Sequence, residues 1–264
     1  MGYDVTGKRV LLTGGSSGIG AELAVTLARA GATVGISGRN KERLAAVLEE
    51  CHEHRPDARM WVADLAEPSE VDRLASVALE ELGGVDVLVN NAGIPKRKHV
   101  TKLDPETVDL VTRVNYLSPV RLTLALLPQM LERGEGRIVN ISSVAATLSS
   151  PGESAYDASK AALTVFSEAM AVDLWDTGVK VLVVYPGIVD TPLFQVPDND
   201  PFDAQIEPIT TAELVAALLD GLARDLVQVY APAYFAELAS GKAANVEGFL
   251  AGSAEWVRQQ QSKA

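Results

Sequence analysis

The sequence predicts an α/β fold in which helices cover both faces of a doubly wound parallel sheet of seven strands. Short apolar segments alternate with longer amphipathic segments along most of the 264 residues. Helical segments of about ten or more residues between successive strands indicate right-handed crossovers between parallel strands. Most strand segments are apolar at consecutive positions, which is the pattern of strands that are buried on both faces.

The N-terminal half contains four predicted strands with three helices between them. Apolar runs such as RVLLT, TVGIS and VDVLV mark strands, and an amphipathic pattern of helical period marks the segments between them. In order, the elements are strand Arg9–Thr13, helix Gly18–Ala30, strand Thr33–Ser37, helix Lys41–His54, strand Arg59–Val62, helix Pro68–Leu82 and strand Val85–Val89.

The C-terminal half continues the alternation, beginning with one long helical pattern. In order, its elements are helix Pro105–Arg133, strand Arg137–Ser142, helix Ala155–Thr177, strand Val179–Val184, helix Thr211–Arg224 and strand Val227–Ala231. No repeat or linker interrupts the pattern, so we expect one domain over residues 1–264. The Pro/Asp-rich stretch Val196–Pro208 predicts a mobile loop at the rim of the sheet, within a substrate loop near 191–210.

Composition limits the classes of function. A hydrophobic content of 47% is enough for a large core and too high for a disordered chain. The net charge of −12 argues against non-specific binding to nucleic acid or to anionic membranes. The start of the chain lacks the apolar region of a signal peptide, and no apolar stretch of about 18 residues predicts a membrane span. We therefore expect a cytoplasmic protein.

Cys51 is the one cysteine, which excludes an intrachain disulfide and fits a reducing compartment. It stands beside His52 and His54 in the sequence CHEH. Because no second cluster of ligands accompanies these residues, we expect a helix end with surface histidines and no metal site.

The first strand leads into Thr13-Gly14-Gly15-Ser16-Ser17-Gly18-Ile19-Gly20, which opens a helix. Gly14 permits a tight turn, Gly18 lets the backbone approach a pyrophosphate, and Gly20 lets the helix pack against the strand. Amide groups at the start of the helix then face the phosphates. The spacing differs from that of a P-loop, so the sequence predicts a dinucleotide site rather than an ATPase.

The second strand ends in Ser37-Gly38-Arg39-Asn40. Sites that prefer NAD usually place an acidic side chain here to bind the ribose 2′-hydroxyl. Gly38 removes that carboxylate, and the Arg39 guanidinium can bind a 2′-phosphate. The sequence therefore favours NADP(H) over NAD(H).

Tyr156 and Lys160 are four residues apart, so they lie one turn apart on one helix face. A lysine near a phenol favours the phenolate, and we expect Lys160 to lower the pKa of Tyr156 towards neutrality. A hydroxyl from another element, Ser143, could hold a substrate oxygen beside the phenol. These residues suit the movement of a proton on or off an alcohol oxygen.

Read in order, the motifs resemble those of the short-chain dehydrogenase/reductase family over roughly Thr6 to Leu193. The resemblance rests on TGGSSGIG, Asp64-Leu65, Asn90-Asn91-Ala92-Gly93, Asn115, Ser143, Tyr156-Asp157-Ala158-Ser159-Lys160, and Pro186-Gly187 followed by Thr191. It implies a Rossmann-type domain that transfers hydride between a nicotinamide cofactor and a small carbonyl or alcohol substrate.

The resemblance implies catalytic roles for Asn115, Ser143, Tyr156 and Lys160. Tyr156 is the general acid or base, and Ser143 orients the substrate oxygen. By resemblance, Lys160 also holds the nicotinamide ribose and Asn115 keeps a water near it. The neighbouring Ser142 is a rival for the role of Ser143.

The residues expected to contact the cofactor come from several parts of the chain, and no metal is expected. They are Gly14, Ser16, Ser17, Gly18, Ile19, Gly20, Arg39, Asp64, Leu65, Asn91, Ala92, Gly93, Tyr156, Lys160, Pro186, Gly187, Val189 and Thr191.

Substrate-side segments have fewer signals. The basic cluster Lys96-Arg97-Lys98-His99 is either a solvated loop or a site that attracts an anionic substrate tail or the cofactor phosphates. Phe194, Val196 and Phe202 could form a lid over an apolar substrate or simply pack within their loop. Substrate identity stays open, with ketones, aldehydes, 3-oxoacyl thioesters and steroid-like alcohols as candidates.

The C-terminal segment 227–264 departs from the family pattern, because its strand is followed by Pro232 and a helix-like run to Leu238 rather than a VDGG-like motif. The usual tetramer is therefore in doubt, and a homodimer or homotetramer through residues 105–133 and 155–177 is expected. Two alternative functions remain: a 3-oxoacyl thioester reductase of lipid metabolism, and a non-catalytic NADP(H)-sensing regulator.

Overall fold

The computed structural model describes residues 2–200 and 206–261 of the chain. Its centre is a seven-stranded sheet in the order β3-β2-β1-β4-β5-β6-β7, and every neighbouring pair is parallel. The strands are β1 (Arg9–Thr13), β2 (Thr33–Gly38), β3 (Arg59–Val62), β4 (Val87–Asn90), β5 (Gly136–Ile141), β6 (Val179–Pro186) and β7 (Gln228–Ala231). The predicted fold class is confirmed.

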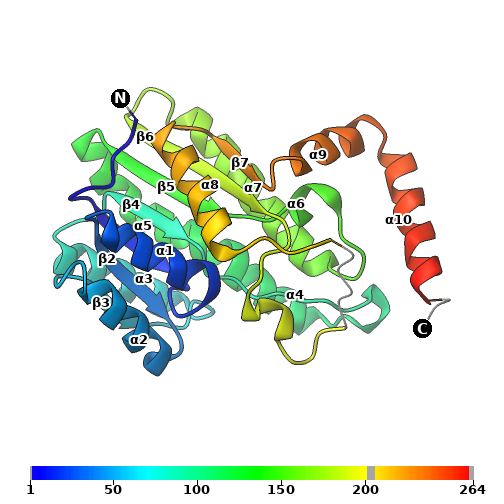
Figure 1. The fold of residues 1–264 in the computed structure, drawn as a ribbon, viewed down its shortest axis with the longest axis horizontal. Coiled ribbons are helices and arrows are strands. Elements are labelled where there is room, and N and C mark those ends of the chain that lie inside the picture. Colours follow the sequence, from blue (N-terminus) through cyan, green and yellow to red (C-terminus); the bar gives the residue numbers. More distant parts are fainter. Residues whose placement is uncertain (1, 201–205, 262–264) are drawn as a thin grey trace.

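Helices cover both faces of this sheet (Figure 1). On one face, α1 (Gly18–Arg29) packs beside α2 (Lys41–His52) and α8 (Thr211–Ala223). The other face is covered by α3 (Pro68–Leu82), α5 (Ser118–Arg133) and α7 (Ser154–Asp173). The shorter elements are η1 (Val100–Lys102), α4 (Pro105–Thr112), η2 (Arg113–Leu117), α6 (Ala145–Leu148) and η3 (Pro192–Gln195).

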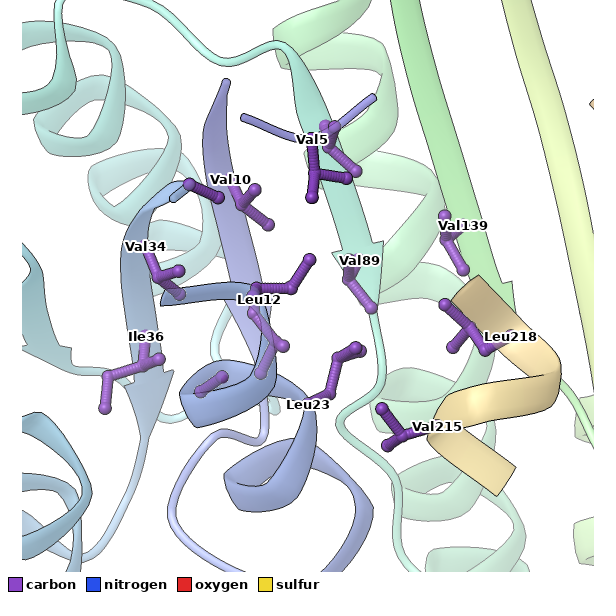
Figure 2. Packing of buried hydrophobic residues seen from close by; sticks show 14 of the residues in the cluster. Val5, Val10, Leu12, Leu23, Val34, Ile36, Val89, Val139, Val215 and Leu218 are labelled. Atoms are coloured by element: carbon purple, nitrogen blue, oxygen red, sulfur yellow. The ribbon is translucent and has the colours of Figure 1, made fainter. Parts of the chain in front are cut away.

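Alternating side chains of the strands feed the two halves of the core. Val10 and Leu12 of β1 pack towards Leu23 of α1, whereas Leu11 belongs to the cluster on the opposite face. Figure 2 shows the first cluster, in which Leu218 of α8 lies near the strand side chains. Full burial of one such side chain stabilises a fold by roughly 1.5–3 kcal/mol. Because helices cover both faces of the sheet, the strands need apolar side chains at consecutive positions.

The strand order identifies the switch point of the sheet. Successive connections run outwards from β1 to β3 on one side and from β4 to β7 on the other. The loops after β1 and β4 therefore diverge at the carboxyl edge of the sheet, which is where open α/β sheets bind ligands.

The long helix predicted over Pro105–Arg133 is wrong in one respect, because a π-helical turn, η2, divides it into α4 and α5. Within this turn the Ser118 amide donates to the carbonyl of Arg113, five residues earlier. Pro119 has no amide hydrogen to donate to the carbonyl of Asn115, which weakens an ordinary helix at this point. The wide turn carries the buried Asn115, whose side chain bonds the Ile94 backbone after β4.

The C-terminal segment contains more helix than the sequence predicts. After β7 come α9 (Phe235–Ala244) and α10 (Val246–Gln261), where the sequence suggests only a helix-like run to Leu238. Figure 1 shows α10 extending beyond the body of the molecule from the end of α9. Among the described residues, none of the helices is both long and apolar enough to cross a membrane.

Candidate active site

The glycine loop joins β1 to α1 at the switch point of the sheet. Gly14 and Gly18 have φ angles of 70° and 55°, which favour glycine. A Cβ on Gly14 would lie 2.8 Å from the Cα of Ala92, and one on Gly20 would collide with the carbonyl oxygen of Gly14. The Ser17 side chain does not cap α1, so the first amides of that helix stay available. The loop therefore fits a pyrophosphate held against backbone amides.

Residues after β4 are hydrogen-bonded to this loop. The Asn91 side-chain amide donates to the carbonyl oxygens of Thr13 (2.9 Å) and Gly14 (3.2 Å). The Thr13 hydroxyl accepts from the backbone amides of Asn91 and Ala92, each at 3.1 Å. These bonds fix the two loops at the switch point relative to each other.

Two predicted catalytic side chains lie next to the backbone at Gly93, after β4. A Cβ on Gly93 would lie 3.3 Å from the Asn115 Oδ1 and 3.4 Å from the Lys160 Nζ. Asn115 accepts from the Ile94 amide at 2.8 Å and donates to the Ile94 carbonyl oxygen at 3.0 Å. The structure therefore places Asn115 and Lys160 side by side.

Tyr156 and Lys160 lie one turn apart on α7, as the spacing predicts. The Lys160 Nζ lies 5.9 Å from the centre of the Tyr156 ring and donates to the Ile141 carbonyl oxygen at 2.7 Å. Lys160 is only 4% exposed, and this burial lowers the pKa of its amine to about 8. Its ammonium is therefore directed at a carbonyl oxygen rather than at the phenol.

The expected lowering of the Tyr156 pKa is wrong for this structure. Burial of the phenol raises its pKa, and the charges of Glu153 and Asp157 raise it further, while the Ser143 hydroxyl lowers it. The physical reason is that loss of water destabilises the phenolate, and Lys160 is not among the groups that offset this loss.

The two rival serines have different environments. Ser142 is 2% exposed, and its hydroxyl contacts Thr164 Oγ1 at 2.8 Å and donates to the Lys160 carbonyl oxygen at 3.2 Å, between β5 and α7. The Ser143 hydroxyl accepts from the Ala145 amide at 3.1 Å and interacts with the Tyr156 phenol. Ser143 is thus the serine that lies next to Tyr156.

Sequence reasoning missed three polar residues around this group. The Ser159 hydroxyl donates to the Tyr156 carbonyl oxygen at 2.7 Å and accepts from the Asn115 amide at 3.1 Å. Glu153 directly precedes α7 and Asp157 lies on it next to Tyr156, and burial raises their pKa values to about 7 and about 8. Only their positions next to Tyr156 in the sequence could have drawn attention to them.

The residues predicted for the adenosine half gather at the same edge. Arg39 is exposed directly after β2 and, among the described residues, makes no hydrogen bond or ion pair. A Cβ on Gly38 would lie 3.3 Å from the Ser16 hydroxyl, so Ser16 faces the end of β2. After β3, Asp64 is exposed and accepts from the Ala66 amide at 3.0 Å, whereas Leu65 is buried.

The end of β6 supplies the residues predicted for the nicotinamide half. The Gly187 amide, after Pro186, donates to the Ala231 carbonyl oxygen at 2.8 Å. Val189 is buried and forms an isolated parallel bridge with Ile209. A Cβ on Gly18 would lie 3.1 Å from the Thr191 methyl group, so Thr191 lies against the glycine loop. Ile19 packs on the core cluster beneath that loop.

The basic cluster Lys96-Arg97-Lys98-His99 is paired within its own chain, with Arg97 buried and His99 exposed. The Lys96 and Lys98 ammonium groups lie 2.8 Å and 3.0 Å from one carboxylate oxygen of Asp198, in the loop after Thr191. Val196 of the expected lid is 41% exposed, and Phe202 lies outside the described residues. The cluster therefore binds the loop around Asp198 of its own chain.

The CHEH segment lies at the end of α2, away from these residues. Cys51 is buried with a free thiol, and a ring nitrogen of His52 contacts the Ala58 carbonyl oxygen at 3.1 Å. Within residues 2–200 and 206–261, no group of three or more potential metal ligands is present.

Comparisons with known proteins agree with this arrangement. The family model described as short chain dehydrogenase matches residues 8–200. Short chain dehydrogenase MYCFIDRAFT_6125 of Pseudocercospora fijiensis (strain CIRAD86) is 39% identical over 190 residues, a match that covers 71% of this chain and 61% of the relative. Ketoacyl reductase HetN of Nostoc sp. (strain PCC 7120 / SAG 25.82 / UTEX 2576) is 38% identical over 185 residues, covering 70% of this chain and 64% of the relative.

The chain thus spans less than two thirds of the length of these two curated relatives. Among solved structures, a short-chain dehydrogenase from Sphingobium yanoikuyae in complex with NADPH superposes with a TM-score of 0.81 at 28% identity. That superposition covers 92% of this chain and 95% of the other. The chain belongs to the short chain dehydrogenase family of oxidoreductases.

Proposed function

We propose that the protein is a cytoplasmic, NADP(H)-dependent oxidoreductase that interconverts a ketone or aldehyde with the corresponding alcohol. The observation that carries this proposal is that Lys160 and Asn115 meet beside Gly93. Lys160 lies one helical turn from Tyr156, and the residue before Gly93 contacts the glycine loop. The bound NADPH in the Sphingobium yanoikuyae structure supports a nicotinamide dinucleotide as cofactor.

In this proposal the chain's own side chains manage the substrate oxygen and its proton. Tyr156 donates its phenolic proton to the carbonyl oxygen during reduction and takes it back during oxidation. Ser143 donates a hydrogen bond to the same oxygen and holds it beside the phenol. The bound nicotinamide supplies or accepts the hydride.

Lys160 and Asn115 complete the set. Lys160, whose amine pKa is lowered to about 8, can exchange a proton near neutral pH without leaving its buried position. Asn115 and Ser159 form a hydrogen-bonded pair beside it, and the Ser159 hydroxyl binds the backbone of Tyr156. We infer that this network fixes the Tyr156 phenol and the Lys160 ammonium relative to each other.

Arg39 supports the preference for the phosphorylated cofactor. Its guanidinium has no partner among the described residues, and Ser16 faces Gly38 at the same edge. A 2′-phosphate placed there would meet a free cation and a hydroxyl and no carboxylate from the end of β2. We propose that the remaining residues of the predicted cofactor set contribute to the same site.

Arg39→Ala is expected to raise the KM for NADPH by roughly 10- to 100-fold, because it removes a charge-assisted hydrogen bond to the phosphate. The KM for NADH should change by less than about twofold, because NADH has no phosphate to lose. Steady-state kinetics with both cofactors provides the measurement. Arg121→Ala, which removes an exposed arginine paired with Asp72 far from this edge, is the matched control. An equal rise of the KM values for NADH and NADPH would contradict the proposal that Arg39 binds the 2′-phosphate.

The substrate class is tested with a panel of ketones, aldehydes and 3-oxoacyl thioesters, followed by the loss of NADPH absorbance. Exclusive activity on 3-oxoacyl thioesters would favour the alternative of a thioester reductase, for which the relative called ketoacyl reductase HetN is a specific argument. Binding of NADPH without turnover of any member would favour the NADP(H)-sensing regulator.

We also propose that the protein forms a homodimer or homotetramer through the η2–α5 segment and α7. Leu117, Leu124 and Leu131 recur every seven residues and are 40–58% exposed. Val165 and Val172 have the same spacing on α7 and are 63% and 73% exposed. Seven-residue spacing puts each set on one helix face, where a second copy can bury it.

The double variant Val165→Lys/Val172→Lys is expected to convert the oligomer into monomers. Each exposed valine contributes roughly 1.5–3 kcal/mol when a partner buries it, and a lysine in its place would have to be desolvated. Light scattering after size-exclusion chromatography gives the mass. Val62→Lys, at an exposed valine on β3, is the control and should leave the mass unchanged. A wild-type protein that is already monomeric would contradict the proposal.

A further inference from the structure

Two loops far apart in the sequence are joined by a set of polar contacts, which we name the loop clasp. It consists of residues 96–99, after β4, and residues 198–200, after Thr191. The Arg97 amide donates to the Asn199 side chain at 2.7 Å, and the Asp200 amide donates to the Arg97 carbonyl oxygen at 2.7 Å. The His99 amide donates to the Asp200 carboxylate at 3.0 Å. Figure 1 shows the segment after β6 reaching the region of α4, which follows the first loop.

Arg97 differs from the two lysines that bind Asp198. It is 5% exposed, and its Nε donates to the Asp200 carbonyl oxygen at 3.2 Å. Its Nη1 lies 3.8 Å from the carboxylate of Glu153, which precedes α7 directly. A buried guanidinium is stable only while its partners stay in place. Arg97 is thus a buried cation between the loop clasp and the start of α7.

Glu153 links this cation to Tyr156. The Asp157 amide donates to the Glu153 carbonyl oxygen at 2.8 Å, which forms the first turn of α7 around Tyr156. A second contact follows the same path, because the Lys98 amide donates to the Gly152 carbonyl oxygen at 2.8 Å. The basic loop therefore binds both the substrate loop and the chain that enters α7.

We propose that Arg97 is a positioning residue that couples the ordering of residues 198–200 to the first turn of the helix that carries Tyr156. When the loop clasp is closed, the Arg97 guanidinium lies against Glu153 and that turn is held in place. When the clasp opens, Arg97 loses Asp200 and Asn199, and Glu153 loses its fixed cation. The coupling is a property of the fold; its effect on catalysis rests on the proposed function.

The charged groups around Glu153 give the coupling a pH dependence. Arg97 faces Glu153 from the loop, Asp157 lies one turn along α7, and Lys242 of α9 faces Asp157. Burial raises the pKa of Glu153 to about 7. Its carboxylate is therefore largely protonated below that pH and binds Arg97 as an ion above it, so the clasp should be tighter at pH 8 than at pH 6.

The test is hydrogen exchange on the full-length protein without added cofactor, comparing wild type with Glu153→Gln. Glu153 makes none of the contacts between the two loops, so an uncoupled clasp would be unaffected by this change. Coupling predicts that the amides of His99 and Asp200 exchange at least roughly fivefold faster in the variant. It also predicts that the extra protection of these amides at pH 8 over pH 6, after correction for intrinsic rates, disappears.

Thermodynamic coupling must act in both directions. Asp198→Asn/Asp200→Asn, which touches only the loop, is therefore expected to speed exchange of the Asp157 amide by a similar factor. Glu106→Gln, an exposed carboxylate of α4 without a hydrogen-bond partner among the described residues, is the control for a lost charge near the loop. Folded Glu153→Gln protein with unchanged exchange at His99 and Asp200 would overturn the coupling.

Kinetics then separates the coupling from the proposed function. Arg97→Lys keeps the charge but shortens the reach to Glu153, and it should raise the KM for the carbonyl substrate several-fold more than it lowers kcat. Coupled exchange in a protein that reduces no substrate would refute the proposed function and leave the coupling intact. Turnover of a carbonyl substrate without coupled exchange would refute the coupling and leave the proposed function intact.

Discussion

Tyr156→Phe is expected to lower kcat/KM for carbonyl reduction by roughly 10²- to 10⁴-fold, the usual contribution of a positioned general acid. The ring stays in the same place at the start of α7, while the phenolic proton beside Ser143 is lost. NADPH binding, followed by cofactor fluorescence, should remain within about threefold, because the glycine loop and Arg39 are untouched. The rate is measured through the loss of NADPH absorbance.

The matched control for this variant is Tyr116→Phe, which removes a phenolic oxygen from a ring that packs edge-on against Phe166. It should retain wild-type turnover. Turnover that survives in Tyr156→Phe would mean that another group supplies the proton, and the mechanism proposed here would be wrong.

Asp157→Asn is expected to stabilise the folded protein at alkaline pH. Burial and the neighbouring Glu153 raise the pKa of Asp157 to about 8 from an ordinary 3.8, and its Oδ1 is buried without a hydrogen-bond partner among the described residues. The folded protein therefore binds this proton more tightly than the unfolded chain does. The stabilising contribution of this group is present at acidic pH and is lost as the pH rises through about 4 to about 8.

At pH 9 the free energy of unfolding of Asp157→Asn should exceed that of wild type by roughly 1–2 kcal/mol, the full shift being reduced by partial contact with solvent. At pH 4 the two proteins should differ by less than about 0.5 kcal/mol, because Asp157 is protonated in the folded state. Urea unfolding at both pH values provides the comparison. Asp109→Asn, an exposed carboxyl on α4, is the control. A variant that is less stable than wild type at pH 9 would contradict the burial of an unfavourable charge.

The strands, most helices and the glycine loop could be predicted because their signals are local. A strand buried on both faces must be apolar throughout, and Val10, Leu11 and Leu12 show why, since the first and last face α1 and the middle one faces the opposite helices. The glycines at 14 and 20 could likewise be interpreted from spacing, because their backbone contacts leave no space for a side chain.

The break between α4 and α5 could not be predicted from periodicity, because the apolar pattern continues through it. Pro119 was a visible signal, yet a proline near the start of a helix is also ordinary. Within the π turn, Asn115 bonds the Ile94 backbone across 21 residues of chain, and a local pattern does not show such a contact.

The pKa of Tyr156 illustrates the same limit. The four-residue spacing correctly places Lys160 on the face of Tyr156, but spacing does not specify where an ammonium points. The Ile141 carbonyl oxygen takes the hydrogen bond from Lys160, and burial then sets the direction of the Tyr156 pKa.

The sequence by itself determined the parallel α/β architecture, the dinucleotide loop and the grouping of Ser143, Tyr156 and Lys160, because each depends on residues close together in the chain. Only the tertiary structure decided what the basic cluster at 96–99 does. Its partners stand about a hundred positions later, at Asp198 and Asp200, and composition shows a charge without showing which opposite charge the fold brings to it.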